Sequence, residues 1–138
     1  MRVLKLLVLA GLLMTQGCVV MAVGAVAAAA AGVTYTVLGT AEKTFNDEYD
    51  AVVAALQKAL VNLDIKTGDT RKTEENGKVV STEIQAFARD LTIIITIERI
   101  TDKATRVVVD ASKKYVVKDA ATAGEILIQT TNNLPKKS

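Results

Sequence analysis

Apolar side chains recur at three- and four-residue intervals between residues 45 and 63, which is the spacing of one face of an α-helix. The stripe consists of Phe45, Tyr49, Val52, Val53, Leu56, Leu60 and Leu63. It predicts a helix over about 46–62, with Thr44 or Asn46 as its N-cap. We interpret this helix as core scaffolding, because an apolar stripe at helical spacing packs against other elements.

A period of two follows the helix and predicts a run of strands. The expected segments are 64–72, 78–87, 91–98 and 106–111. Between the first two, Asn76-Gly77 is typical of a tight type I′ hairpin, because both residues tolerate positive φ angles. In the third, the odd-numbered apolar residues would line one face, and Ile94 would lie on the opposite, mixed face.

Two more elements flank this run of strands. A short first strand is expected around 40–45, and a final helix over about 119–133, with Asp119 as its N-cap and Pro135 shortly after its end. The resulting order, β-α-β-β-β-β-α, predicts the α+β class: an antiparallel sheet of about four or five strands with two helices packed on one face.

The first 38 residues differ from the rest, because their only charges are two basic residues near the start. A basic start followed by the short apolar run 6–14 is typical of a secretory signal peptide. The only cysteine of the chain, Cys18, comes directly after Gly17 at the end of this run. The pattern predicts a bacterial lipoprotein signal peptide over 1–17, cleavage between Gly17 and Cys18, and lipid attachment at Cys18.

One detail departs from this pattern, since Thr15 stands three residues before the cysteine, where such sites usually carry leucine. Two alternatives remain open. Cys18 could be an ordinary buried cysteine, or a general signal peptidase could cut in the alanine-rich run 27–31.

The lipidated Cys18 and the uncharged segment that follows it are assigned to a tether over 18–38, rich in alanine, valine and glycine. Three interpretations of this segment are open: an apolar tether lying against the membrane, a transmembrane helix, or a closely packed helix. In the last, Gly24, Ala28 and Gly32 would share one face and mediate self-association near the bilayer.

Residues 39–134 are expected to form the single folded domain, and 135–138 a frayed tail. The chain holds 17 basic and 15 acidic residues, and loss of the two basic residues of the signal peptide leaves 15 of each. A neutral mature chain argues against a nucleic-acid partner, which would need a concentrated basic surface.

A search for chemistry finds no pattern of an active site. The chain has no histidine, so the side chain that most often moves protons or binds metals near neutral pH is missing. Ser112 with Lys113 and the pair Glu74-Glu75 are better explained as surface residues than as a nucleophile with its base or a carboxylate pair. We therefore predict no catalytic, cofactor-binding or metal-binding residues, no cofactor and no enzymatic activity.

Several features together resemble a known family: the leader that ends at Cys18, the apolar spacer, Gly39 before the segment 40–45, and the helix containing Ala54-Ala55-Leu56. The chain resembles the small bacterial lipoproteins grouped as domain of unknown function 3568. This resemblance implies a lipid-anchored envelope protein without an assigned activity, and it brings no catalytic residues.

Taken together, the sequence predicts a lipoprotein held at the membrane by acyl chains on Cys18, and Val19 after the cysteine favours the outer membrane with the domain facing the periplasm. The domain would act as a structural or protein-binding module, with an envelope protein or a second copy as partner. The exposed edge of the strand run or the face that carries Ile94 would make the contact. The alternative is a carrier of a small apolar ligand or lipid between helices and sheet.

Overall fold

Seven antiparallel strands form one sheet in the part of the chain that the computed structural model describes, residues 32–36 and 38–137. Their order across the sheet is β1-β2-β6-β5-β4-β3, and the short β7 also pairs with β6. The bounds are β1 Thr34–Tyr35, β2 Ala41–Phe45, β3 Lys66–Glu75, β4 Lys78–Ala88, β5 Leu91–Thr101, β6 Ala104–Lys113 and β7 Val117–Lys118. Helix α3 spans Tyr49–Asn62 and helix α4 spans Ala120–Asn133. The α+β class is confirmed, but the expected four or five strands are too few.

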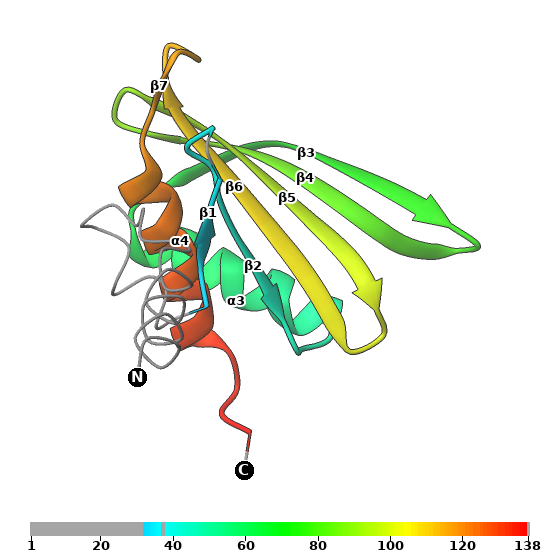
Figure 1. The fold of residues 1–138 in the computed structure, drawn as a ribbon. Helices are drawn as coiled ribbons and strands as arrows, with labels where there is room; N and C mark the ends of the chain where they lie inside the picture. Colours follow the sequence, from blue (N-terminus) through cyan, green and yellow to red (C-terminus); the bar gives the residue numbers. More distant parts are fainter. Residues whose placement is uncertain (1–31, 37, 138) are drawn as a thin grey trace, which may run out of the picture.

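Both helices lie on the same side of the sheet (Figure 1). They contact each other, and α4 also packs on β2 and β6. The side chains that they cover are the alternating apolar residues of the central strands, and the fully buried ones include Ile93, Ile95, Ile97, Val107 and Val109. The predicted helical stripe lies in the same core, where Val52, Leu56 and Leu60 are almost completely buried. The period-two and helical patterns therefore indicate the two sides of one core.

The start of α3 differs from the prediction. The helix begins at Tyr49 after Glu48, whose side chain makes no capping hydrogen bond, so Thr44 or Asn46 as N-cap is wrong. The physical reason is that β2 continues through Phe45, which pairs with Thr105 of β6, so the chain must first leave the sheet before it can turn into a helix.

The predicted turn and the second helix cap are confirmed. Asn76 and Gly77 have φ angles of 52° and 75°, as a type I′ hairpin requires. Asp119 accepts a hydrogen bond of 2.9 Å from the backbone N–H of Thr122 and so caps α4. The strand before the hairpin is longer than expected, since β3 runs to Glu75 rather than to residue 72.

The folded part begins before Gly39. Strand β1 pairs with β2, and Val33 is only 4% exposed in the core. Part of the predicted tether over 18–38 is therefore part of the sheet, and the strand expected around 40–45 has β1 on its outer side. A strand of two residues is too short to show a period, so the sequence pattern did not reveal it.

Several predictions lie outside the described residues: the signal peptide over 1–17, the cleavage site at Gly17 and Cys18, the lipid attachment, and the part of the tether before Gly32. Among the helices that are described, neither is long and apolar enough to cross a bilayer. The chain end expected to be frayed, 135–138, is exposed as far as it is described, and the ammonium group of Lys137 lies 3.3 Å from the carboxylate of Asp47.

Candidate interaction site

Strand β3 forms one edge of the sheet, and all ten of its residues are exposed. It pairs with β4 on one side only. In a strand at the end of a sheet, the N–H and C=O groups that point away from the neighbour have no partner strand. The strand therefore presents ten residues of backbone on which another strand can pair.

The helices leave most of this strand uncovered. Figure 1 shows the β3–β4 hairpin, which extends beyond both α3 and α4. The side chains of β3 are polar on both faces, and none of them is an aliphatic or aromatic residue. Because such side chains gain little from burial, the strand stays outside the core.

Two features of β3 are typical of edge strands that are protected against unwanted pairing with other strands. The pairing with β4 is interrupted by two register shifts, one between Thr67 and Thr70 and one between Thr73 and Glu74. Charged side chains also line the strand, and Arg71 makes only a 4.0 Å contact with Glu83 while it is 83% exposed. These features oppose unspecific pairing, and they leave a defined pattern of charge for a specific partner to match.

A cleft of about 380 Å³ lies between α3 and the start of β3. Its floor is apolar, with Val53 and Leu60 from the helix and Ile65, Val79 and Ile84 from the segment before β3 and from β4. On its inner wall the hydroxyl of Tyr49 donates a hydrogen bond to the hydroxyl of Thr82. This is the position between helix and sheet where an apolar ligand was expected in the carrier interpretation.

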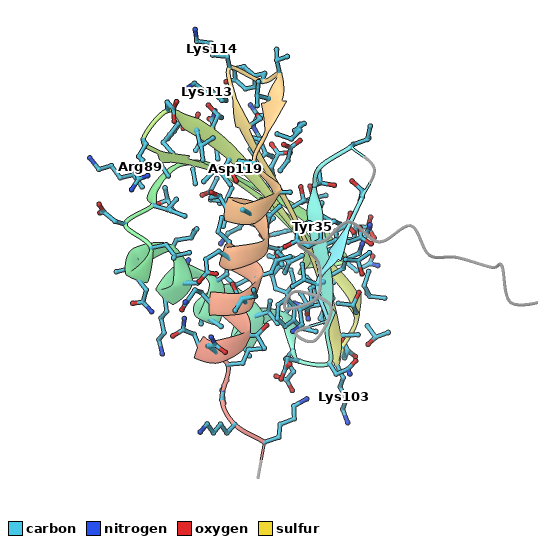
Figure 2. The ribbon with its side chains drawn as sticks, turned by 60° about the vertical axis from the view of Figure 1, so that its left-hand side comes forward. Tyr35, Arg89, Lys103, Lys113, Lys114 and Asp119 are labelled. Atoms are coloured by element: carbon cyan, nitrogen blue, oxygen red, sulfur yellow. The ribbon has the colours of Figure 1, made fainter. Side chains whose placement is uncertain are left out.

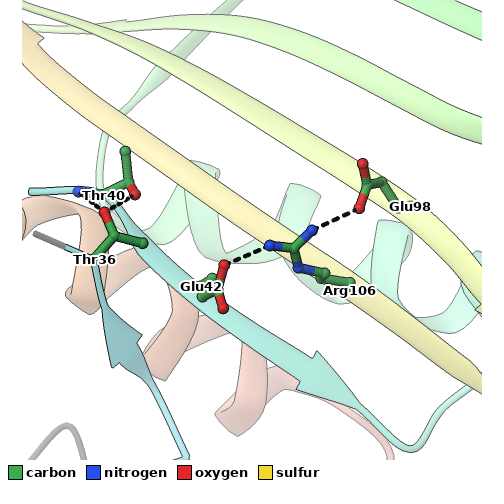
Figure 3. A network of polar contacts seen from close by, with 5 residues as sticks. All are labelled: Thr36, Thr40, Glu42, Glu98 and Arg106. Carbon is green, nitrogen blue, oxygen red and sulfur yellow. Dashed lines mark hydrogen bonds and ion pairs between the residues drawn. The ribbon is translucent and has the colours of Figure 1, made fainter. Parts of the chain in front are cut away.

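The open face of the sheet, which carries Ile94, is held together by polar contacts. Arg106 of β6 donates hydrogen bonds to Glu42 of β2, at 2.6 Å, and to Glu98 of β5, at 3.2 Å (Figure 3). The hydrogen bond to Glu42 is the main reason why the pKa of Arg106 lies above its ordinary value. Ile94 is half-buried on this face, where it lies between the polar residues Gln85 and Asp110 of the neighbouring strands.

A turn near this face is also fixed by a polar contact. The hydroxyl groups of Thr36 and Thr40 lie 2.6 Å apart across the turn between β1 and β2 (Figure 3). Gly39 in the same turn has a φ of 77°, a conformation that suits glycine. The turn therefore holds β1 against β2.

A larger hollow of about 1080 Å³ lies where the β4–β5 turn approaches the start of α4. Figure 2 shows Arg89 and Lys113 at this end of the molecule, with Asp119 at the start of the helix. Two of the cations that line the hollow form ion pairs, Lys113 with Asp90 and Lys118 with Asp110. The hydrogen bond from Lys113 also lowers the pKa of Asp90.

The residues considered for chemistry do not come together. Ser112 is 5% exposed and therefore buried, which corrects its assignment to the surface, whereas Lys113 is exposed and pairs with Asp90. Glu74 and Glu75 are both exposed on β3. In the described part of the chain, no group of three or more cysteine or acidic side chains could hold a metal ion.

The sequence did carry a signal for the edge. A strand with a helix on one face normally has apolar residues at every second position, and the strand Lys66–Glu75 has none. This absence indicates a strand that is uncovered on both faces. Sequence reasoning found the strand but did not use this property to place it at the edge.

The described residues define a class of protein: a one-sided α+β domain whose sheet has helices on one face and an uncovered edge strand. The chain belongs to the family described as protein of unknown function (DUF3568), whose model matches residues 2–114. The predicted family resemblance is thus confirmed. Among proteins with curated descriptions, none matches the chain.

Proposed function

We propose that this protein is a non-enzymatic lipoprotein of the bacterial envelope, anchored by acyl chains on Cys18, whose α+β domain acts as a structural or protein-binding module. The anchor is supported by the sequence, in which Cys18 follows Gly17 directly after a short apolar run. Two or three acyl chains hold a domain at a bilayer, whereas a single chain binds it only weakly. Val19 after the cysteine supports delivery to the outer membrane, with the domain in the periplasm.

The observation that carries the binding role is the free edge of β3. Ten exposed residues pair on one side only, and a partner strand added there would gain backbone hydrogen bonds from the outward-pointing groups of the regular part of the strand. The sequence interpretation offered the strand edge or the Ile94 face as contact surface. The edge is favoured, because the ion pairs of Arg106 occupy the open face.

Proline variants test this role, because proline removes one backbone N–H. Successive N–H groups of a strand point to opposite sides, so one of Thr70 and Thr73 directs its N–H to the open edge and the other directs it to β4. We expect one of Thr70→Pro and Thr73→Pro to keep the wild-type unfolding midpoint. That variant should lose the envelope partner that co-purifies with the full chain, and Lys58→Ala on α3 is the matched control. Unchanged co-purification in the stable proline variant contradicts the role.

The anchor is tested separately with Cys18→Ala. We expect the full wild-type chain to fractionate with membranes and to show in its intact mass the added lipid on a cleaved chain. The variant should lack the added lipid mass and should keep residues 1–17. An unmodified thiol on a chain that still carries residues 1–17 contradicts the anchor.

The cleft beside α3 favours a second candidate, a carrier of a small apolar ligand or lipid. Its volume of about 380 Å³ and apolar floor suit an acyl chain. Val53 lines the cleft, whereas the neighbouring Ala54 is exposed and is not among the residues that line it. Val53→Trp should abolish saturable binding of a fluorescent fatty acid, and Ala54→Trp should leave it unchanged. Equal binding by both variants contradicts the carrier role.

A further inference from the structure

In the second half of strand β3, the charges on the two sides of Thr73 have opposite signs. The residues are Arg71, Lys72, Thr73, Glu74 and Glu75, so that two cations precede the threonine and two anions follow it. All five are exposed, and they form the end of β3 next to the hairpin turn. A strand with this pattern is complementary to itself when it is turned round.

The register that uses this complementarity is defined by geometry. If two copies pair antiparallel about a two-fold axis at Thr73, residues equally far from Thr73 lie opposite each other. Lys72 then faces Glu74 of the second copy, and Arg71 faces Glu75 of the second copy. Each such pair is separated by an even number of positions along the strand, so both side chains lie on the same face of the sheet. Directly opposite charges on one face stabilise a strand pair.

The pairing inside each copy continues this order of charges. Within the chain, Glu75 lies opposite Lys78 and Arg71 lies opposite Glu83. Across the boundary between the two paired strands, four side chains would lie next to one another on one face of the sheet. They are Lys78 and Glu75 of one copy, followed by Arg71 and Glu83 of the second copy. The sign of the charge alternates along the whole row.

Neighbouring registers lack this property. A two-fold axis at Arg71, Lys72 or Glu74 places that charged residue opposite its own copy, which is repulsive. An axis at Thr70 places in the joint the irregular segment between Thr67 and Thr70, where β3 itself carries an extra residue. The second register shift, between Thr73 and Glu74, places its extra residue, Val80, on β4, so β3 itself has no extra residue from Thr70 to Glu75. The charge pattern thus selects one register out of those available to the regular part of the strand.

We propose that the β3 edge binds a second copy of this chain, through antiparallel pairing of residues 71–75 about Thr73. This inference names the partner for the edge and so rests on the binding role proposed above, but it does not depend on the lipid anchor. The paired sheets would form one continuous sheet with the helices of both copies on the same side. Because all the paired charges are exposed, the association weakens as salt screens them.

The experiment uses cross-linking from the two-fold axis in the full chain in its membrane. Thr73→Cys places the two introduced thiols opposite each other, and a short bismaleimide bridges them without requiring disulfide geometry. Ala54→Cys, on the exposed side of α3, is the control for random collisions. We expect a covalent dimer from Thr73→Cys and none from Ala54→Cys or from the chain without an added cysteine.

Charge exchange in the Thr73→Cys background then tests the register. Arg71→Glu with Lys72→Glu makes the segment acidic, and Glu74→Lys with Glu75→Lys makes it basic. Each double substitution should reduce the dimer yield about tenfold, because four favourable cross-strand pairs become repulsive. All four substitutions together, as well as a mixture of the acidic and basic variants, should restore it. Circular dichroism checks that these exposed substitutions leave the fold intact.

The outcomes are separable from the test of the binding role. A dimer yield that ignores the double substitutions, or that is not restored by the fourfold exchange, overturns the inference. Absence of the dimer, together with loss of a different envelope protein from the stable proline variant, overturns self-pairing while the binding role stands.

Discussion

The phenol ring of Tyr35 lies directly on the backbone of Gly124. A Cβ atom built on Gly124 would stand 3.0 Å from Cζ of Tyr35 and even closer to its hydroxyl oxygen. Figure 2 shows Tyr35 on β1 beside α4. The contact requires glycine on the helix, and it connects the two-residue edge strand β1 to the last helix of the chain.

Because of this contact, Gly124→Ala should have opposite effects on the free energy of unfolding in the wild type and in the Tyr35→Ala variant. In the wild type, Gly124→Ala should lower the free energy of unfolding by about 1–3 kcal/mol, because the ring must move or the helix must shift. With Tyr35→Ala present, the same substitution should raise it by up to about 1 kcal/mol, because alanine favours a helix interior. Urea unfolding of the four proteins measures both values. A gain of stability from Gly124→Ala in the wild type would show that β1 does not pack on α4.

The buried hydrogen bond between Tyr49 and Thr82 gives a second prediction. Thr82→Val keeps the shape of the side chain but leaves the tyrosine hydroxyl without its partner in the core, where Tyr49 is 3% exposed. The free energy of unfolding should fall by about 1–3 kcal/mol. Adding Tyr49→Phe to this variant should recover most of the loss, because both polar groups are then removed. A double variant less stable than Thr82→Val contradicts this account.

The N-cap of α4 gives a third prediction. Asp119→Ala removes the acceptor for the backbone N–H of Thr122 and should cost about 0.5–2 kcal/mol in urea unfolding. Asp119→Asn retains an oxygen acceptor and should remain close to the wild type. Equal losses in the two variants would indicate that charge, rather than the capping hydrogen bond, stabilises this end.

A fourth prediction concerns acid stability. Lys78 donates a hydrogen bond to Asp102 and holds the pKa of this carboxyl below its ordinary value of 3.8. Because the folded pKa lies below the unfolded one, the pair stabilises the fold above pH 3.8, and this contribution is lost as pH falls through the folded pKa. Asp102→Asn should therefore have a lower unfolding midpoint than the wild type at neutral pH, with the two curves converging in acid.

Two comparisons check the cause of that pH dependence. Lys78→Gln should show the same convergence as Asp102→Asn, since it removes the other partner of the pair. Since the carboxylate is 81% exposed, the difference at neutral pH should shrink at high salt. A difference that persists below the folded pKa contradicts the ion pair as its origin.

The sequence predicts the core well, because burial acts through periodicity. The alternation around Ile93 and Ile95, the stripe through Leu56, and the cap at Asp119 are all local patterns, and each is present in the structure. The positive φ angles at the Asn76-Gly77 turn are also local, because they depend on the two turn residues themselves.

The features missed by the sequence depend on contacts between distant residues. Strand β1 pairs with β2 and contacts the distant Gly124 through Tyr35, and a strand of two residues cannot show a period. The delayed start of α3 depends on the pairing of Phe45 with Thr105. The order of the strands places β3 at the edge. This order depends on pairing between distant segments, so it cannot be deduced from the sequence of any one segment.

The central claim is that the β3 edge is the docking surface of an envelope lipoprotein. A photo-cross-linking amino acid placed at Thr73 of the full chain, and irradiated in intact cells, tests it most directly. The account predicts a discrete adduct, identified by mass spectrometry as a protein of the envelope or as a second copy of this chain, and no such adduct from the same probe at Ala54. No adduct from Thr73, or the same adducts from both positions, contradicts it.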